Sequence, residues 1–293
     1  PTRGLRRLCG CAIRSDPQQM ENLFSMASVR PVSPVAAYIG GKKKLAQRIA
    51  SIIEQIPHRL YAEPFVGMGG VFFRRQLIPR AEVINDRSGD VVTLFRILQR
   101  HYPQFLEVMK FQLTSRREFE RLSCTDPATL TDLERAARFL YLQRLAFGGK
   151  VAGRSFGVDG EGGARFNLTR LAPILEDVHE RLAGVVIEGL DWRDFIDRYD
   201  RPDALFYLDP PYFGNERDYG EGVFERDDFC KMAEHLRTIK GRFVISLNDR
   251  PAVREIFSRF PIHGVGVNYS ISGGQGAEAL EVIILDGKDP MPA

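Results

Sequence analysis

One short stretch constrains the fold of this 293-residue chain more than any other. The apolar run Ala204–Leu208 has the length of a buried strand, and it ends at Asp209-Pro210-Pro211-Tyr212. Neither proline has a backbone N–H to donate to a neighbouring strand, so the strand is expected to stop there. Open α/β sheets bind ligands outside the carboxyl ends of their strands. Asp209 and Tyr212 are therefore expected at a ligand site.

These residue types suit methyl transfer to an exocyclic amino nitrogen of a nucleobase. The 6-amino nitrogen of adenine is a poor nucleophile because its lone pair is delocalised into the ring. The Asp209 carboxylate and the Pro210 carbonyl would accept hydrogen bonds from this amine and localise its lone pair. The Pro-Pro unit restricts the backbone, so the carbonyl is held in place before the base arrives. Tyr212 offers a flat face for a base taken out of the duplex. An exposed Asp titrates near 3.9, so we expect an acceptor rather than a strong base. The alternative is a proline-rich turn with a solvated Asp.

A second corner lies upstream, where a short strand from Leu60 runs into the glycines at 67–70 and an apolar helix start. Strand, glycine turn and helix form the corner that binds nucleotide-like ligands. The full GxGxxG phosphate fingerprint is absent, which favours a ligand with adenosine and amino-acid parts but no pyrophosphate. Asp86 ends the next expected strand, nineteen positions after Gly67. At that offset an acid meets ribose hydroxyls, which is the role we expect for Asp86; a cap on the following helix is the alternative, and the two roles are compatible.

The segment before this corner carries two glycines and three lysines over 40–44, followed by an amphipathic helix expected over 45–56. A Gly-Gly-Lys entry to a helix favours an anionic group near the helix N-terminus. It is not a Walker A loop, because the spaced first glycine is missing. Three successive lysines are also common on a solvated helix face.

Composition narrows the class further. The chain is 44% hydrophobic and 27% charged with a net charge of +3, which permits a polyanionic partner without requiring one. No apolar run approaches the roughly 20 residues that span a bilayer, so no membrane association is expected. The cysteines form neither a disulfide framework nor a zinc pattern, and no histidines stand at metal-ligand spacing, so we expect no metal and a reduced, cytoplasmic compartment. Residues 1–34 are expected to be a disordered extension, with a transit-like segment or a loose nucleic-acid contact as alternatives.

The composition changes between residues 101 and 167. Helical periodicity over 103–122 and 132–147 comes with many arginines, and a basic, glycine-rich loop with aromatic residues follows. Cations of this kind fix phosphates, while Arg and Asn side chains can contact base edges. The sequence therefore predicts a DNA-binding insert, with a flexible solvated loop as the alternative. Its expected DNA contacts are Lys150, Arg154, Arg165 and Asn167.

Four motifs occur in one order along the chain: Tyr-Ile-Gly-Gly-Lys at 38–42, Glu-Pro-Phe-Val-Gly-Met-Gly-Gly at 63–70, Asn-Asp-Arg at 85–87 and Asp-Pro-Pro-Tyr at 209–212. In this set and order the chain resembles the Dam-like adenine-specific DNA methyltransferases, from about Tyr38 to Leu285. The resemblance implies a Rossmann-like class I methyltransferase sheet and S-adenosylmethionine as cofactor. It also implies methylation of the 6-amino group of adenine, flipped out of a specific sequence in double-stranded DNA.

The resemblance assigns residues and domains as well. The catalytic set is Asp209, Pro210, Pro211 and Tyr212. The cofactor site would be lined by Tyr38, Lys42, Pro64, Phe65, Gly67, Gly69, Asp86, Asp191 and Asp209. Residues 35–100 and 168–288 would form the α/β catalytic domain, and 101–167 a mainly helical target-recognition domain inserted into it. Two late strands, 264–269 and 279–285, would close the sheet as an antiparallel hairpin.

This chain also departs from the family pattern, and alternatives follow. The family has Asn-Gly after the phenylalanine and a proline after Phe-Asn, whereas Gly148 and Gly149 follow Phe147 here and Leu168 follows Asn167. The recognition sequence is therefore left open. An N(4)-cytosine methyltransferase, which typically has Ser in place of Asp209, a protein-glutamine methyltransferase and a catalytically silent DNA-binding relative are the alternatives. A solitary phage or prophage enzyme and the partner of a restriction endonuclease are equally compatible.

Overall fold

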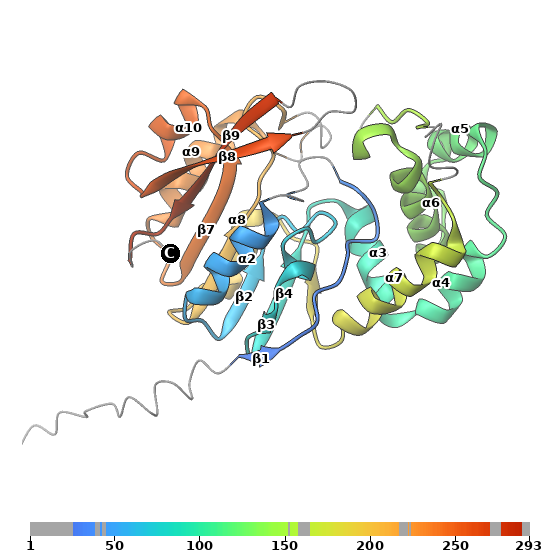
Figure 1. Ribbon diagram of the computed structural model, residues 1–293, viewed down its shortest axis with the longest axis horizontal. Helices are drawn as coiled ribbons and strands as arrows, with labels where there is room; N and C mark the ends of the chain where they lie inside the picture. The colour runs from blue at the N-terminus through green and yellow to red at the C-terminus, as the bar shows by residue number, and fades with distance from the viewer. Residues whose placement is uncertain are drawn as a thin grey trace, which may run out of the picture.

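The computed structural model describes residues 26–38, 42, 45–151, 153–157, 165–216, 222, 224–269 and 277–288. Within these residues the main sheet has seven strands in the order β5-β4-β2-β6-β7-β9-β8. Figure 1 labels β2, β4, β7, β8 and β9 of this sheet. The pairs that link β5, β4, β2, β6 and β7 are parallel, and β9 is antiparallel to both β7 and β8. The strands are β2 (Leu60–Glu63), β4 (Ala81–Asn85), β5 (Val186–Glu188), β6 (Ala204–Leu208), β7 (Arg242–Asn248), β8 (Ile262–Tyr269) and β9 (Ala277–Leu285).

The central strand β6 shows why this sheet has two covered faces. All five of its residues are buried, and successive side chains enter two different hydrophobic clusters. Leu205 and Tyr207 belong to the first cluster, and Phe206 and Leu208 belong to the second. Side chains alternate across a strand, and a parallel sheet needs cover on both sides, so a continuous apolar run is required. The first cluster includes residues of α2 (Ala46–Gln55), α3 (Gly89–Arg100) and α7 (Leu168–Arg181). The second includes residues of α8 (Trp192–Tyr199), α9 (Arg226–Leu236) and α10 (Pro251–Ile256).

A group of helices lies beside the sheet in Figure 1. It contains α4 (Tyr102–Met109), α5 (Arg116–Cys124) and α6 (Asp132–Leu145), and α6 packs against α3, α4 and α5. Thr131 and Glu134 form a capping box that begins α6. The helical periodicity over 103–122 is interrupted in the structure, because α4 ends at Met109 and α5 begins only after Ser115, which caps it. Short 3-10 turns, η2 (Pro127–Thr129) and η3 (Phe147–Gly149), flank α6.

Residues 27–32, near the end of the segment 1–34 that was expected to be disordered, are hydrogen-bonded to the rest of the fold. β1 (Ala27–Ser28) pairs antiparallel with β3 (Leu77–Ile78), and the Val29 and Val32 N–H groups donate to the carbonyls of Gln76 and Phe73. These backbone hydrogen bonds anchor residues 27–32 to η1 (Phe72–Arg74) and to the segment that follows it. Residues 1–25 lie outside the described part of the chain. No helix in the described ranges has the length and apolar character needed to span a membrane.

Candidate active site

The site forms where the sheet reverses its strand order. β4 and β5 lie on one side of β2, and β6 and β7 lie on the other. Because β2 and β6 pair in parallel, Glu63 and Asp209 leave the sheet at the same carboxyl edge. Ligands of open α/β sheets bind at such switch points. A cavity of about 390 Å³ opens here, and both Gly67 and Asp209 line it.

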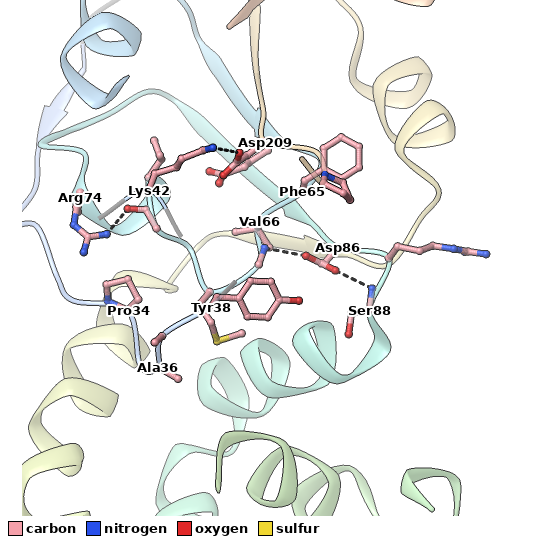
Figure 2. A pocket seen from close by; sticks show the side chains of 18 of the residues that line it. Pro34, Ala36, Tyr38, Lys42, Phe65, Val66, Arg74, Asp86, Ser88 and Asp209 are labelled. Carbon is pink, nitrogen blue, oxygen red and sulfur yellow. Dashed lines mark hydrogen bonds and ion pairs between the residues drawn. The ribbon is translucent and has the colours of Figure 1, made fainter. Parts of the chain in front are cut away.

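The cavity collects most of the predicted cofactor residues from four separate segments. Figure 2 shows Lys42 and Asp209 on one side, Asp86 and Ser88 on another, and Tyr38 against the glycine turn. Pro34 and Ala36, which precede Tyr38, also line it. The predicted residues that line it are Tyr38, Lys42, Phe65, Gly67, Asp86, Asp209 and Pro211.

Asp86 is tied to the glycine turn by its own side chain. Its Oδ2 accepts the backbone N–H of Gly67 at 2.8 Å, and its Oδ1 accepts that of Ser88 at 2.8 Å (Figure 2). Gly67 has φ +50°, and a Cβ there would approach the Tyr38 ring to 3.0 Å, so glycine is needed. Burial raises the pKa of the Asp86 carboxyl to about 6, although both backbone hydrogen bonds oppose this shift. Each oxygen keeps acceptor capacity for a hydroxyl group in the cavity.

Glu63 lines the same cavity and was not singled out from the sequence. It ends β2 and accepts a hydrogen bond from the Tyr61 hydroxyl at 2.7 Å. Burial raises the pKa of the Glu63 carboxyl to about 8, so this group is mostly protonated at neutral pH. The sequence carried a signal for it, because Glu63-Pro64 ends one buried strand as Asp209-Pro210 ends another.

Asp209 belongs to a buried network around Lys42. The Lys42 ammonium lies 3.1 Å from Asp209 Oδ1 and 3.1 Å from Glu281 Oε2, and it donates to the Tyr212 hydroxyl at 2.7 Å. The Ser246 hydroxyl donates to Asp209 Oδ1 at 3.2 Å. Burial raises the pKa of the Asp209 carboxyl to about 6, against the opposing effect of Lys42. The expectation of an ordinary exposed Asp was therefore wrong, since this side chain is only 21% exposed and its pKa is raised.

Five of the predicted cofactor and catalytic residues do not line the cavity: Pro64, Gly69, Asp191, Pro210 and Tyr212. Pro64 offers its carbonyl to the Asn85 amide at 2.9 Å, which joins the ends of β2 and β4. Gly69 has φ +70°, and a Cβ there would lie 2.4 Å from the Phe73 ring, so it shapes the turn. Asp191 caps α8 by accepting the Arg193 N–H at 3.0 Å. Tyr212 directs its hydroxyl into the Lys42 network.

The predicted DNA contacts differ in accessibility. Lys150 and Asn167 are exposed, and Asn167 also caps α7. The Arg154 guanidinium is half-buried, 5.5 Å from the Phe139 ring centre, and donates to the Gln143 side chain at 3.3 Å. Arg165 is also half-buried, and its carbonyl accepts from Arg144 at 3.0 Å. An aromatic side chain that the sequence reasoning passed over, Phe147, is 61% exposed beside this loop.

Hydrogen bonds from Gln143 connect this loop to the cavity wall. The buried Gln143 amide on α6 donates to the carbonyl of Ala37 at 2.8 Å and to that of Gly149 at 2.7 Å. Gly149 has φ +68°, and a Cβ there would lie 3.1 Å from the backbone of Ala37 and Tyr38. The backbone that carries Tyr38 into the cavity is therefore packed directly on the loop that bears Lys150.

The mostly parallel seven-stranded sheet of the described residues, with an acid-lined cavity at its switch point, is consistent with a methyltransferase fold. Residues 38–271 match the family described as D12 class N6 adenine-specific DNA methyltransferase, and the chain belongs to this family. Its reaction is methylation of the 6-amino group of adenine in DNA.

Relatives support this membership. A type II methyltransferase of Lactococcus lactis subsp. cremoris, M1.LlaDCHI, is 25% identical over 79% of this chain and 87% of its own. A type II methyltransferase of Paramecium bursaria Chlorella virus NC1A, M.CviBI, is 21% identical over 78% of this chain and 88% of its own. A DNA adenine methylase of Salmonella typhi is 26% identical over 73% of this chain and 81% of its own.

Proposed function

We propose that the enzyme takes its methyl group from S-adenosylmethionine and transfers it to an adenine flipped out of double-stranded DNA. One observation carries this proposal: Asp209 of the catalytic motif and the Gly67–Asp86 corner line one cavity. Methyl donor and acceptor must meet within bonding distance, so their sites have to share a wall. Holding both groups in line supplies much of the rate acceleration in such a displacement.

The residues at the cavity fit this cofactor. The tight Gly67 turn lets a ligand approach the backbone closely, and Asp86 retains oxygen lone pairs for ribose hydroxyls. The cavity of about 390 Å³ lies within the range of small-molecule sites. When bound, the cofactor supplies an electrophilic methyl carbon on a sulfonium. We propose direct contacts from Tyr38, Lys42, Phe65, Gly67, Asp86 and Asp209, and support of the turn by Pro64 and Gly69.

Asp191 has a different place in this proposal. Its side chain caps α8 and is absent from the cavity wall, so capping is the role that the contacts favour. A cofactor contact from Asp191 remains the second possibility. Substitution separates the two, because a cap affects stability and a ligand contact affects affinity.

For the chemical step we propose that the Asp209 carboxylate and the Pro210 carbonyl each accept a hydrogen bond from the adenine amine, which releases one proton to water once it carries the methyl group. Pro211 restricts the backbone and so holds the Pro210 carbonyl before the base arrives, while Lys42 and Ser246 hold the Asp209 carboxylate. With its pKa raised to about 6, Asp209 is still mostly ionised at neutral pH and is a better hydrogen-bond acceptor than an exposed Asp. The ring of Tyr212 would stack on the flipped base.

For DNA binding we propose that residues 101–167 form the target-recognition domain. Lys150 is exposed and suited to a phosphate contact, and Asn167 is exposed at the start of α7. Of the other two predicted contacts, Arg165 is kept, and Arg154, which lies over Phe139 and donates to Gln143, is proposed to support the loop. The exposed Phe147 is added because apolar wedges insert between base steps. Residues 35–100 and 168–288 would then be the catalytic domain.

We further propose that the antiparallel pair β8 and β9 is the hairpin that closes the methyltransferase sheet. Its connection, 270–276, lies outside the described residues. A restriction endonuclease partner, a solitary phage or prophage role and a cytoplasmic location remain expectations from the sequence.

The test combines one substitution with identification of the product. Asp209→Ala is expected to abolish methylation of double-stranded DNA by S-adenosylmethionine while retaining DNA affinity within a few fold. Methylated DNA is digested to nucleosides, and the modified base is identified by mass. Asp203→Ala is the matched control, because Asp203 precedes the opposite end of β6, where it pairs with Arg59 and Arg201. Near-normal turnover by Asp209→Ala, or a product other than N6-methyladenine, contradicts the proposal.

A further inference from the structure

A buried carboxylate on the antiparallel part of the sheet needs a physical reason. Glu281 on β9 is only 1% exposed and is followed by the buried apolar residues 282–285. A carboxylate removed from water is unfavourable unless it is paired and hydrogen-bonded. β9 pairs with β7 so that Glu281 lies opposite Asn248, the last residue of β7. This register brings Glu281 to the same edge of the sheet as Asp209.

Its partners come from two distant segments. Glu281 Oε2 lies 3.1 Å from the Lys42 ammonium, and Oε1 accepts the Tyr212 hydroxyl at 2.8 Å. Lys42 in turn donates to that hydroxyl at 2.7 Å and pairs with Asp209 at 3.1 Å. The Glu281 carboxylate therefore holds both Tyr212 and Lys42, the partner of Asp209. The side chains of Glu281, Lys42 and Tyr212 each contact the other two.

From this geometry we propose that Glu281 is a positioning residue for methyl transfer, which holds Lys42 and Tyr212 in place beside the Asp209 carboxylate. This inference rests on the proposed role of Asp209. Glu281 itself does not line the cavity, and it acts through the other two side chains.

The Glu281 carboxylate should also affect the reaction through its charge. Lys42 pairs with two carboxylates and not with one, so the group of one ammonium and two carboxylates is net negative. Positive charge reaches the adenine amine as the methyl group is transferred, and a preorganised negative group stabilises it. Without Glu281, Lys42 would pair with Asp209 alone and weaken it as an acceptor. In agreement, the Glu281 carboxylate raises the pKa of Asp209, and Lys42 lowers it.

The position also orients the ring of Tyr212. A hydroxyl held by both Lys42 and Glu281 fixes the ring whose face is proposed to receive the flipped base. Loss of Glu281 would remove one hydrogen bond from that hydroxyl and leave the ring less restricted.

The experiment compares Glu281→Gln, Glu281→Asp and Tyr212→Phe with the parent enzyme, using S-adenosylmethionine and duplex DNA. Glu281→Gln retains the size and removes the charge. We expect its single-turnover rate to fall 10- to 100-fold, with cofactor and DNA dissociation constants changed less than threefold. Glu188→Gln is the matched control, because Glu188 also ends a strand of this sheet and accepts a tyrosine hydroxyl, from Tyr199 at 2.6 Å. We expect its rate to equal that of the parent.

The acid limb of the rate profile separates positioning from a purely structural role. At saturating cofactor, the limb of kcat/KM for DNA is expected to move to lower pH in Glu281→Gln, because Asp209 loses a neighbour that raises its pKa. Glu281→Asp restores the charge and should return the limb toward its parent position. The other groups that face Asp209, which are Lys42, Glu63, Tyr207 and Ser246, are unchanged in the two Glu281 variants, as is Tyr212 beside Lys42.

Each outcome decides the inference. An unchanged rate and acid limb in Glu281→Gln overturn it, as does a rate loss matched by equal loss in Glu281→Asp with no shift of the limb. If Glu281→Gln does not fold, Tyr212→Phe carries the test: a severalfold rate loss at unchanged DNA affinity supports the inference, and a parental rate overturns it. Asp209→Ala is assayed in parallel. Near-normal turnover by that variant contradicts the proposed function, whereas an inactive Asp209→Ala beside a fully active Glu281→Gln refutes this inference alone.

Discussion

The Asp86 carboxylate accepts the backbone N–H of Gly67 at 2.8 Å, so the acid that follows β4 is fastened to the glycine turn that follows β2. Two neighbouring parallel strands thereby share one corner of the cavity. A side chain that both shapes a turn and faces a ligand affects stability and affinity together. The proposed ribose contact and the observed turn contact are therefore parts of one function of Asp86.

Substitution of Asp86 tests this double role. Asp86→Ala removes two hydrogen bonds to backbone N–H groups, so we expect a loss of about 1–3 kcal/mol of stability and at least a tenfold rise in the cofactor dissociation constant. Urea unfolding and calorimetric titration measure the two effects. Asp191→Ala is the control: loss of a helix cap costs about 1 kcal/mol, and cofactor affinity should be unchanged. An equal loss of affinity in Asp191→Ala would place that residue in the cofactor site.

The pH dependence of the reaction reports on Asp209. Its pKa is raised to about 6, and protonation weakens this carboxylate as an acceptor for the adenine amine, so the rate should fall as the pH drops through about 6. Burial also raises the pKa of Asp86 to about 6. Single-turnover rates at saturating cofactor therefore report on Asp209, while cofactor affinity against pH reports on Asp86. An acid limb centred near pH 4 would mean that Asp209 is not desolvated in the working enzyme.

The free energy of unfolding should depend on the protonation of Glu63 between about pH 4.5 and 8. Its pKa is raised from 4.5 to about 8, so the folded state holds a proton that the unfolded state has lost over this range. Stability therefore decreases as pH rises from about 4.5 to 8, with a slope of at most about 1.4 kcal/mol per pH unit. Glu63→Gln should remove this component. Urea unfolding between pH 6.5 and 8 measures it, and parallel curves for the two proteins would contradict the prediction.

Two adjacent glycines allow backbone strain to be separated from packing. Gly148 and Gly149 both have φ +68°, but a Cβ on Gly148 meets nothing within 4 Å, whereas one on Gly149 meets the Ala37–Tyr38 backbone at 3.1 Å. Gly148→Ala should lose only the strain, about 1–2 kcal/mol. Gly149→Ala should lose about 1–3 kcal/mol more and weaken cofactor binding, because Tyr38 is displaced. Equal effects on cofactor affinity would show that the loop and the cavity wall are independent.

Salt dependence separates an exposed phosphate contact from a packed arginine. Lys150→Ala should weaken DNA binding at low salt and reduce the slope of log K against log salt by about 0.9, with little change in stability. Arg154→Ala should instead destabilise the protein, because Arg154 lies over Phe139 and pairs with Gln143. Fluorescence anisotropy with a duplex at several salt concentrations measures the slope. An unchanged slope for Lys150→Ala would remove it from the interface.

Local chemistry in the sequence was sufficient to find the two strand ends that matter. The apolar run before Asp209 and the glycines after Glu63 are local signals, and parallel strands place their carboxyl ends at one edge. The amphipathic helix expected over 45–56 is found as Ala46–Gln55 for the same reason, because its apolar spacing is a property of consecutive residues. The interruption between α4 and α5 was missed, because residues on both sides keep helical spacing while Ser115 begins a new helix through its cap.

Only the tertiary structure decided what surrounds those strand ends. Glu281 lies 239 positions from Lys42 along the chain, and no periodicity or motif links them. The pKa values of Asp209, Asp86 and Glu63 depend on burial, which is set by every segment packed around the cavity. Arg154 and Lys150 look alike as basic loop residues, yet one is packed and the other exposed. Sequence patterns specify elements because backbone geometry is local, whereas electrostatic environment is a sum over neighbours that only the folded chain brings together.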